Sequence, residues 1–92
     1  MKEFTYQIED PNGMHARPAG QLANFAKGFE SSICVRFGEK KADAKRLLSL
    51  MSLGAVHGAS LVFSIEGDDE ASAAASLEAF CKNGFSASGV SD

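Results

Sequence analysis

The sequence predicts an α+β fold in which helices cover one face of a mostly antiparallel β-sheet. Three observations lead to this prediction. The 92 residues are too few for a second hydrophobic core, so we expect one domain. The apolar residues alternate in some segments and recur every three or four residues in others, in the order β-α-β-β-α-β-α. Turn-forming residues separate these segments, and a hydrophobic content of 45% is ordinary for a globular protein.

A strong turn separates the first strand from the first helix. Residues 4–8 alternate between apolar and polar side chains, which is typical of a half-buried strand. Asp, Pro, Asn and Gly follow at 10–13 and predict a turn. An apolar stripe of helical period then runs from Ala16 to near Gly28, and Pro18 is tolerated only in the first turn of such a helix.

The middle of the chain predicts a hairpin followed by a short helix. Residues 33–37 alternate, a Gly-Glu pair forms a tight turn, and a short third strand covers 40–42. Residues 45–53 return to a helical period, and Gly54 is a suitable stop for that helix.

The C-terminal part predicts the last strand and the last helix. Residues 61–65 alternate, and 70–82 have a helical period that ends before a glycine. The acidic residues at 66–70 suit a turn and a helix cap better than a calcium site, because the oxygen spacing of an EF-hand is missing. We therefore expect the domain to cover 1–84 and a frayed tail to cover 85–92.

Composition and charge argue against several classes of protein. Nine Lys and Arg against twelve Asp and Glu give a net charge of −3, which does not favour a nucleic-acid binder. No apolar run approaches the ~18 residues of a membrane span. The first residues lack the apolar block of a signal peptide. These features predict a cytoplasmic protein that does not insert into membranes.

The cysteines and histidines do not predict a metal site. Without a signal peptide, Cys34 and Cys81 are expected to be reduced thiols. Together with His15 and His57 they contain no pair at metal-ligand spacing, so we expect no bound metal. His57 is most simply a surface loop residue.

The segment around His15 is the strongest candidate for chemistry. His15 falls where a turn meets a helix, and the N-terminus of a helix exposes unpaired N–H groups with a partial positive charge. The N–H groups of Ala16 and Arg17 could bind a phosphate, and that positive end disfavours imidazolium. The Arg17 guanidinium could neutralise phosphoryl oxygens. The pattern therefore indicates a covalent phosphohistidine, although a surface turn histidine and a solvated arginine would give the same sequence.

Two motifs extend this interpretation to a family. The segment Gly13–Ala19 (GMHARPA) closely resembles the G-[LIM]-H-A-R-P-A signature of HPr, the histidine-containing phosphocarrier of the bacterial sugar phosphotransferase system. The segment Met51–Gly54 (MSLG) is similar to a second HPr motif at the end of the second helix. The resemblance runs from about Lys2 to Lys82.

The resemblance implies a specific role. HPr-like proteins accept a phosphoryl group from the phosphohistidine of enzyme I, which is charged by phosphoenolpyruvate, and pass it to the IIA domains of sugar permeases. By motif position, His15 would carry the group on Nδ1 and Arg17 would be its charge partner. Such a carrier is not an enzyme with its own turnover and needs no cofactor. The family's open-faced β-sandwich, with four strands covered on one face by three helices, agrees with the order of elements given above.

The resemblance also implies a docking surface near the second helix. Met14 would flank this surface beside His15, and the residues that match the family's exposed patch are Leu47, Leu48 and Met51. Positive charge from Arg17, Lys27, Lys45 and Arg46 could steer acidic partners to this face. A monomer is expected, because an oligomer contact could cover the docking surface.

One departure concerns regulation. Many relatives have a serine, phosphorylated by an ATP-dependent kinase, where this chain has Arg46. Arginine cannot accept phosphate, so we expect this regulation to be absent or to use another residue. Ser49 and Ser52 lie nearby but are more simply structural helix serines.

Three alternatives remain at this stage. An HPr-like regulatory binding protein would share the fold. A nitrogen-type phosphotransfer paralogue would share His15 and Arg17 but relay phosphate for signalling. A small acylphosphatase would have a similar order of elements, but it needs an arginine-bearing phosphate loop and an asparagine that orients water, and the sequence offers no second such group.

Overall fold

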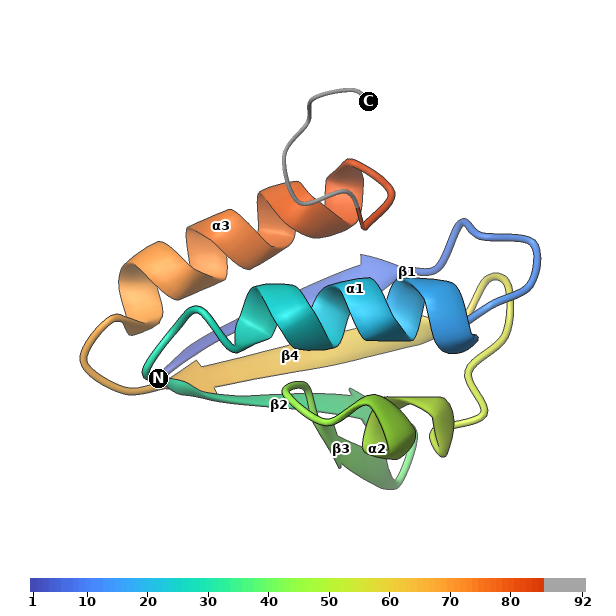
Figure 1. The fold of residues 1–92 in the computed structure, drawn as a ribbon, viewed down its shortest axis with the longest axis horizontal. Helices are drawn as coiled ribbons and strands as arrows, with labels where there is room; N and C mark the ends of the chain where they lie inside the picture. The colour runs from blue at the N-terminus through green and yellow to red at the C-terminus, as the bar shows by residue number, and fades with distance from the viewer. Residues whose placement is uncertain (86–92) are drawn as a thin grey trace.

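Four strands form one antiparallel sheet, and three helices lie on one of its faces (Figure 1). The computed structural model describes residues 1–85. The strand order is β1-β4-β2-β3. The elements are β1 (Lys2–Gln7), α1 (Ala16–Ala26), β2 (Ser32–Phe37), β3 (Lys40–Asp43), α2 (Leu47–Met51), β4 (Ser60–Glu66) and α3 (Glu70–Lys82). This architecture confirms the predicted α+β open-faced sandwich and the order β-α-β-β-α-β-α.

The core lies between the sheet and the helices. Along β4 the side chains of Leu61, Phe63 and Ile65 are fully buried, while the residues between them face the open side. Phe63 is paired with Phe4 of β1 and Val35 of β2, and the rings of Phe4 and Phe63 stack at 4.7 Å. The alternation predicted from the sequence is therefore the two-residue period of a sheet with one covered face.

The second helix is shorter than the sequence predicts. It covers Leu47–Met51 instead of 45–53. The Asp43 carboxylate accepts the N–H of Lys45 at 2.9 Å, and the Asp43 carbonyl accepts the N–H of Arg46 at 3.0 Å. These bonds hold residues 43–46 in a turn, so the first helical residue is Leu47. The first helix also ends two residues early, at Ala26 instead of near Gly28.

Phe85, the first residue of the predicted frayed tail, is packed in the structure. Gly84 has a φ of +72° and follows α3 in a Schellman motif, in which the N–H of Gly84 donates to the Cys81 carbonyl and the N–H of Phe85 to the Phe80 carbonyl. Phe85 is only 5% exposed and belongs to the core. The remainder of the predicted tail, 86–92, lies outside the described residues.

Asp69 ties the start of α3 to the loop before β2. Its carboxylate accepts the N–H groups of Glu30 at 2.9 Å and Ser31 at 3.0 Å, and also the Ser31 hydroxyl. These bonds, led by the Ser31 hydroxyl, lower the pKa of Asp69. Asp69 is the N-cap residue of α3, but its side chain makes no capping hydrogen bond. The Glu70 carboxylate in the first turn accepts the Gly67 N–H at 3.1 Å and so holds the turn before the helix.

Candidate functional site

A hydrogen-bonded loop between β1 and α1 positions the candidate site. The Asp10 carboxylate accepts the N–H of Asn12 at 2.8 Å, and the Asp10 carbonyl accepts that of Gly13 at 2.9 Å. The Met14 N–H donates to the Ala55 carbonyl at 2.9 Å, which pins this loop to the one after α2. Gly13 has a φ of +70°, and a Cβ there would lie 2.5 Å from the Ala55 oxygen. Only glycine therefore allows this approach without strain.

His15 is the N-cap residue of α1, where the sequence predicts it. Its backbone is extended, and its carbonyl accepts the N–H of Ala19 at 3.0 Å, as the first bond of the helix. Its side chain makes no capping hydrogen bond and is 37% exposed. The imidazole is therefore not used to satisfy the helix and is accessible from outside.

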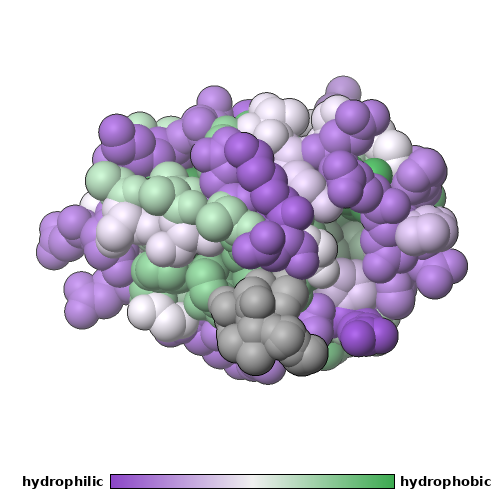
Figure 2. Space-filling model, turned by 90° about the horizontal axis from the view of Figure 1, so that it is seen from above, coloured by the Kyte–Doolittle hydropathy of each residue, from purple (hydrophilic) through white to green (hydrophobic). Residues whose placement is uncertain are grey.

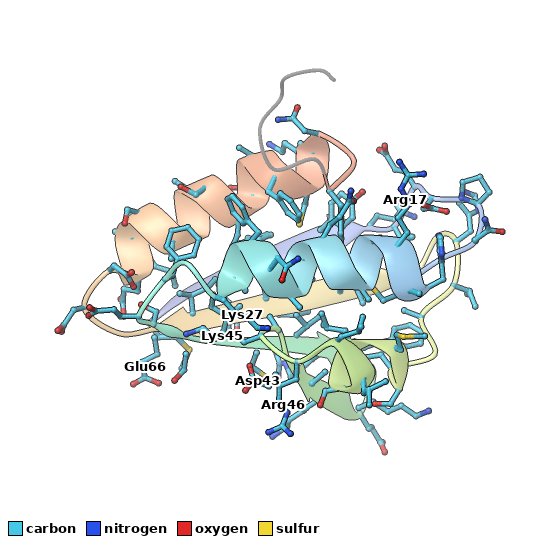
Figure 3. All side chains as sticks on the ribbon, in the orientation of Figure 1. Arg17, Lys27, Asp43, Lys45, Arg46 and Glu66 are labelled. Carbon is cyan, nitrogen blue, oxygen red and sulfur yellow. The ribbon has the colours of Figure 1, made fainter. Side chains whose placement is uncertain are left out.

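The first turn of α1 presents two backbone donors. Pro18 has no N–H, and within residues 1–85 the N–H groups of Ala16 and Arg17 have no partner. The first turn contains no acidic residue that would offset the positive end of the helix. Arg17 projects from this end of α1 (Figure 3). This end of α1 can therefore attract an anion.

A polar hollow of about 470 Å³ lies over this helix end. It brings His15 and Arg17 together, as predicted. Its lining is completed by Asp10, Asn12, Pro18, Gln21 and Gly84. The hollow places His15 and Arg17 around one space at the N-terminus of α1. An imidazole with a guanidinium beside it is an arrangement that can stabilise a phosphoryl group on the imidazole.

Asp10 is a site residue that the sequence analysis missed, because it was interpreted only as a turn former. Its Oδ2 lies 3.4 Å from Nε2 of His15. The Asn12 N–H lowers the pKa of Asp10 most, and His15 lowers it further. A carboxylate five residues before the histidine, across a tight turn, is the sequence signal that could have indicated this contact.

The apolar residues of the predicted docking surface differ in their exposure. Leu47 and Met51 are exposed, and Leu48 is 78% exposed, on α2. Met14 is not part of this surface, because it is 6% exposed and packs in the core. Its backbone bond to Ala55 holds it in a buried position next to the site.

Val56 extends the exposed apolar surface toward the site and was missed by the sequence analysis. Its side chain is exposed, and its Cα lies 2.7 Å from the position that a Cβ on Gly13 would take. It therefore lies against the loop that carries His15.

The four predicted cations do not form one cluster. Arg17 lies in the first turn of α1, whereas Lys27 follows the last turn of that helix (Figure 3). The Lys45 ammonium donates to the Phe29 carbonyl at 2.7 Å, so it is engaged within the fold. Arg46 is exposed and is the N-cap residue of α2.

The side of the molecule that carries α3 lacks the large exposed apolar side chains of α2 within residues 1–85. Figure 2 looks onto this side, where hydrophilic side chains predominate around a band of apolar surface. The exposed apolar residues of α3 are the small side chains Ala71, Ala75 and Ala79. In residues 1–85 the exposed large hydrophobic side chains are Met1, Leu47, Leu48, Met51 and Val56.

The remaining candidate residues stay apart from this site. His57 is exposed in a loop, Cys34 is half-buried, and burial raises the pKa of the Cys81 thiol to about 12. Within the described part of the chain, no three His, Cys, Asp or Glu side chains form a group that could hold a metal ion. Among those same residues, no helix is long and apolar enough to cross a membrane. The Ser52 hydroxyl donates to the Ser49 carbonyl at 2.7 Å, as a structural helix serine does.

Comparison with known proteins identifies the family. Residues 2–83 match the family model described as the PTS HPr component phosphorylation site. The chain belongs to the HPr family. The phosphocarrier protein HPr of Lysinibacillus sphaericus is 43% identical over 70 residues, which are 76% of this chain and 80% of that protein. The resemblance inferred from the two motifs is thereby confirmed.

Two further comparisons concern the extent of this similarity. The multiphosphoryl transfer protein of Xanthomonas campestris pv. campestris is 43% identical over 68 residues, which are 74% of this chain but only 8% of that protein. The crystal structure of HPr-C-His from Thermoanaerobacter tengcongensis has a TM-score of 0.86 and 40% identity, and the match covers 92% of this chain and 96% of that chain. Membership of the HPr family supports a role as a carrier in phosphotransfer, which agrees with a protein that is not itself an enzyme.

Proposed function

We propose that this chain carries a phosphoryl group on Nδ1 of His15. In this proposal it accepts the group from the phosphohistidine of enzyme I, charged by phosphoenolpyruvate, and delivers it to IIA domains of sugar permeases. The main support is the geometry of His15, whose half-exposed imidazole makes no capping bond at a helix N-terminus with two unpaired N–H groups. The second support is membership of the HPr family.

The transfer step needs no cofactor and no added proton. The lone pair of Nδ1 attacks phosphorus while the P–N bond of the donor phosphohistidine breaks, and the electron pair of that bond returns to the donor ring. The N–H groups of Ala16 and Arg17 and the Arg17 guanidinium are the donors for the phosphoryl oxygens. Since these donors are fixed before the reaction, their reorganisation costs little.

We propose that partners dock on the exposed face of α2. Leu47, Leu48 and Met51 provide its apolar centre, and Val56 connects it to the loop of His15. Arg46 supplies positive charge at its edge. A small apolar centre with a charged rim suits a carrier that must bind and release several partners. We expect a cytoplasmic monomer, for which two free thiols are suitable.

The deciding experiment mixes the purified protein with enzyme I and phosphoenolpyruvate and follows the mass of the intact chain. We expect one acid-labile phosphoryl group, which is lost in His15→Ala and retained in His57→Ala, a matched change at an exposed loop histidine.

Three other results would contradict the proposal. A phosphoryl adduct that persists in His15→Ala would assign another residue. Release of phosphate without an adduct would indicate a hydrolase. No adduct, under conditions in which the same enzyme I phosphorylates an established HPr, would favour a regulatory binding protein.

A further inference from the structure

We propose that Asp10 is a positioning residue for His15, which holds the imidazole as the Nε2–H tautomer and so leaves the lone pair on Nδ1. This inference rests on the proposed function, since it assigns a role within phosphoryl transfer. The observation behind it is the distance of 3.4 Å between Nε2 of His15 and Oδ2 of Asp10. Within residues 1–85 Nδ1 has no hydrogen-bond partner.

The Asp10 carboxylate is held in place by its own loop. Its Oδ1 accepts the Asn12 N–H at 2.8 Å, and its carbonyl accepts the Gly13 N–H at 2.9 Å. Oδ2 is therefore the oxygen that remains for the imidazole. The bond from Asn12 lowers the pKa of Asp10, so the group is a carboxylate that accepts and does not donate. A carboxylate facing Nε2 favours a proton on that nitrogen.

The same contact serves both directions of transfer. When Nδ1 is phosphorylated, the proton stays on Nε2, and the positive charge that the ring gains is offset by the Asp10 carboxylate. When the Nδ1–P bond breaks toward an acceptor, its electron pair returns to Nδ1, and the neutral Nε2–H imidazole is restored. No proton has to enter or leave in either step.

The substitution Asp10→Asn tests this role with little change of shape. The amide oxygen can still accept the Asn12 N–H, so the turn is retained. The amide N–H2 then takes the place of Oδ2 and donates to Nε2, which favours the Nδ1–H tautomer and removes the nucleophilic lone pair. Glu9→Gln is the matched control, because it removes the same charge from an adjacent exposed residue that is not bonded to His15.

The experiment has a spectroscopic and a kinetic readout. The 15N shifts of the His15 ring, recorded at about pH 8, where an ordinary imidazole is neutral, report the tautomer without any phosphate donor. We expect Nε2–H in the unmodified chain and in Glu9→Gln, and Nδ1–H in Asp10→Asn. We expect phosphoryl transfer from enzyme I to be about tenfold slower in Asp10→Asn alone, since a hydrogen bond to a charged group is lost.

Each outcome separates the two proposals. An unchanged tautomer or an unchanged transfer rate in Asp10→Asn overturns the role of Asp10, while phosphorylation of the unmodified chain upholds the proposed function. If the unmodified chain accepts no phosphoryl group, the proposed function fails, whatever tautomer the ring adopts. Equal slowing in Glu9→Gln would also overturn the inference, because it would indicate a general effect of charge.

Discussion

The N–H of Phe85 donates to the carbonyl of Phe80 at 3.0 Å, and the two rings lie 5.3 Å apart. The Phe85 ring also lies 5.7 Å from that of Tyr6 on β1. The end of α3 is thus closed by a hydrogen bond and an apolar contact between the same two residues, as in other Schellman motifs. Phe85 is therefore packed between the end of α3 and β1, next to Gly84 of the candidate site.

Removing the Phe85 ring should destabilise the fold. We expect Phe85→Ala to lower the free energy of unfolding by about 3 kcal/mol, as the substitution of other buried phenylalanines by alanine does. Phe85→Leu, which keeps most of the apolar volume, should lose less. Urea denaturation of both variants measures this. A chain shortened to residues 1–84 should be as unstable as Phe85→Ala. If chains of residues 1–84 and 1–85 were equally stable, the assignment of Phe85 to the core would be contradicted.

The Asp69 carboxylate should make stability depend on pH. Its pKa is lowered in the folded chain, so its stabilising contribution is present above the unfolded pKa of about 3.9 and is lost as the pH falls through the folded value. We expect Asp69→Asn to reduce the loss of stability between neutral and acidic pH, measured as the urea midpoint. Asp68→Asn, at an exposed neighbour, should keep the dependence of the unmodified chain.

The glycine at position 13 should be necessary for both the fold and the site. We expect Gly13→Ala to lower the free energy of unfolding by about 3 kcal/mol, because alanine is strained at positive φ and its Cβ would meet the backbone at Ala55. Gly20→Ala in α1 is the matched control, since a Cβ there meets nothing within 4 Å and a helical alanine should add about 0.5–1 kcal/mol. Thermal and urea unfolding measure the stability of both variants. A Gly13→Ala variant as stable as the unmodified chain would refute the close approach of Gly13 to the Ala55 carbonyl.

Much of the fold and the site could be predicted from local sequence. Alternation identified the strands because only one face of the sheet is covered, and Pro18 fixed the start of α1, which located His15 as its N-cap. These features depend on neighbours along the chain, so a pattern of residue types is enough to indicate them.

Other features depend on contacts between distant segments. Met14 and Leu48 are both large and apolar, but a backbone bond to Ala55 holds Met14 in the core, while Leu48 lies on the outer face of α2 and is 78% exposed. The contact between Asp10 and His15 exists because the turn folds back on the start of α1. No periodicity predicts such contacts. The burial of Phe85 could have been predicted, because the residue after a C-terminal glycine often packs on the helix.

The exposed face of α2 should affect partner binding without affecting stability. We expect Leu48→Asp to raise the KM for enzyme I by about tenfold, through loss of an apolar contact, and to change the free energy of unfolding by no more than about 0.5 kcal/mol. Ala75→Asp on α3, on the other side of α1 in Figure 1, introduces the same charge at an exposed helical position and should leave the KM unchanged. Steady-state phosphoryl transfer measures both. An equal rise in KM for both variants would indicate a general charge effect instead of docking on α2.

The Arg17 guanidinium should stabilise the charge that develops during transfer. It is exposed and lies in the first turn of α1, so its removal should leave the fold intact. We expect Arg17→Ala to slow phosphoryl acceptance by about 10- to 100-fold, as the loss of an electrostatic donor does elsewhere, with an unchanged urea midpoint. Arg17→Lys keeps the charge but not the planar pair of donors, so it should recover only part of the rate. Lys40→Ala, at the exposed first residue of β3, removes one positive charge from a residue that does not line the polar hollow, and this variant should transfer normally. Full activity of Arg17→Ala would exclude the guanidinium from the reaction and leave the backbone N–H groups as the donors for the phosphoryl oxygens.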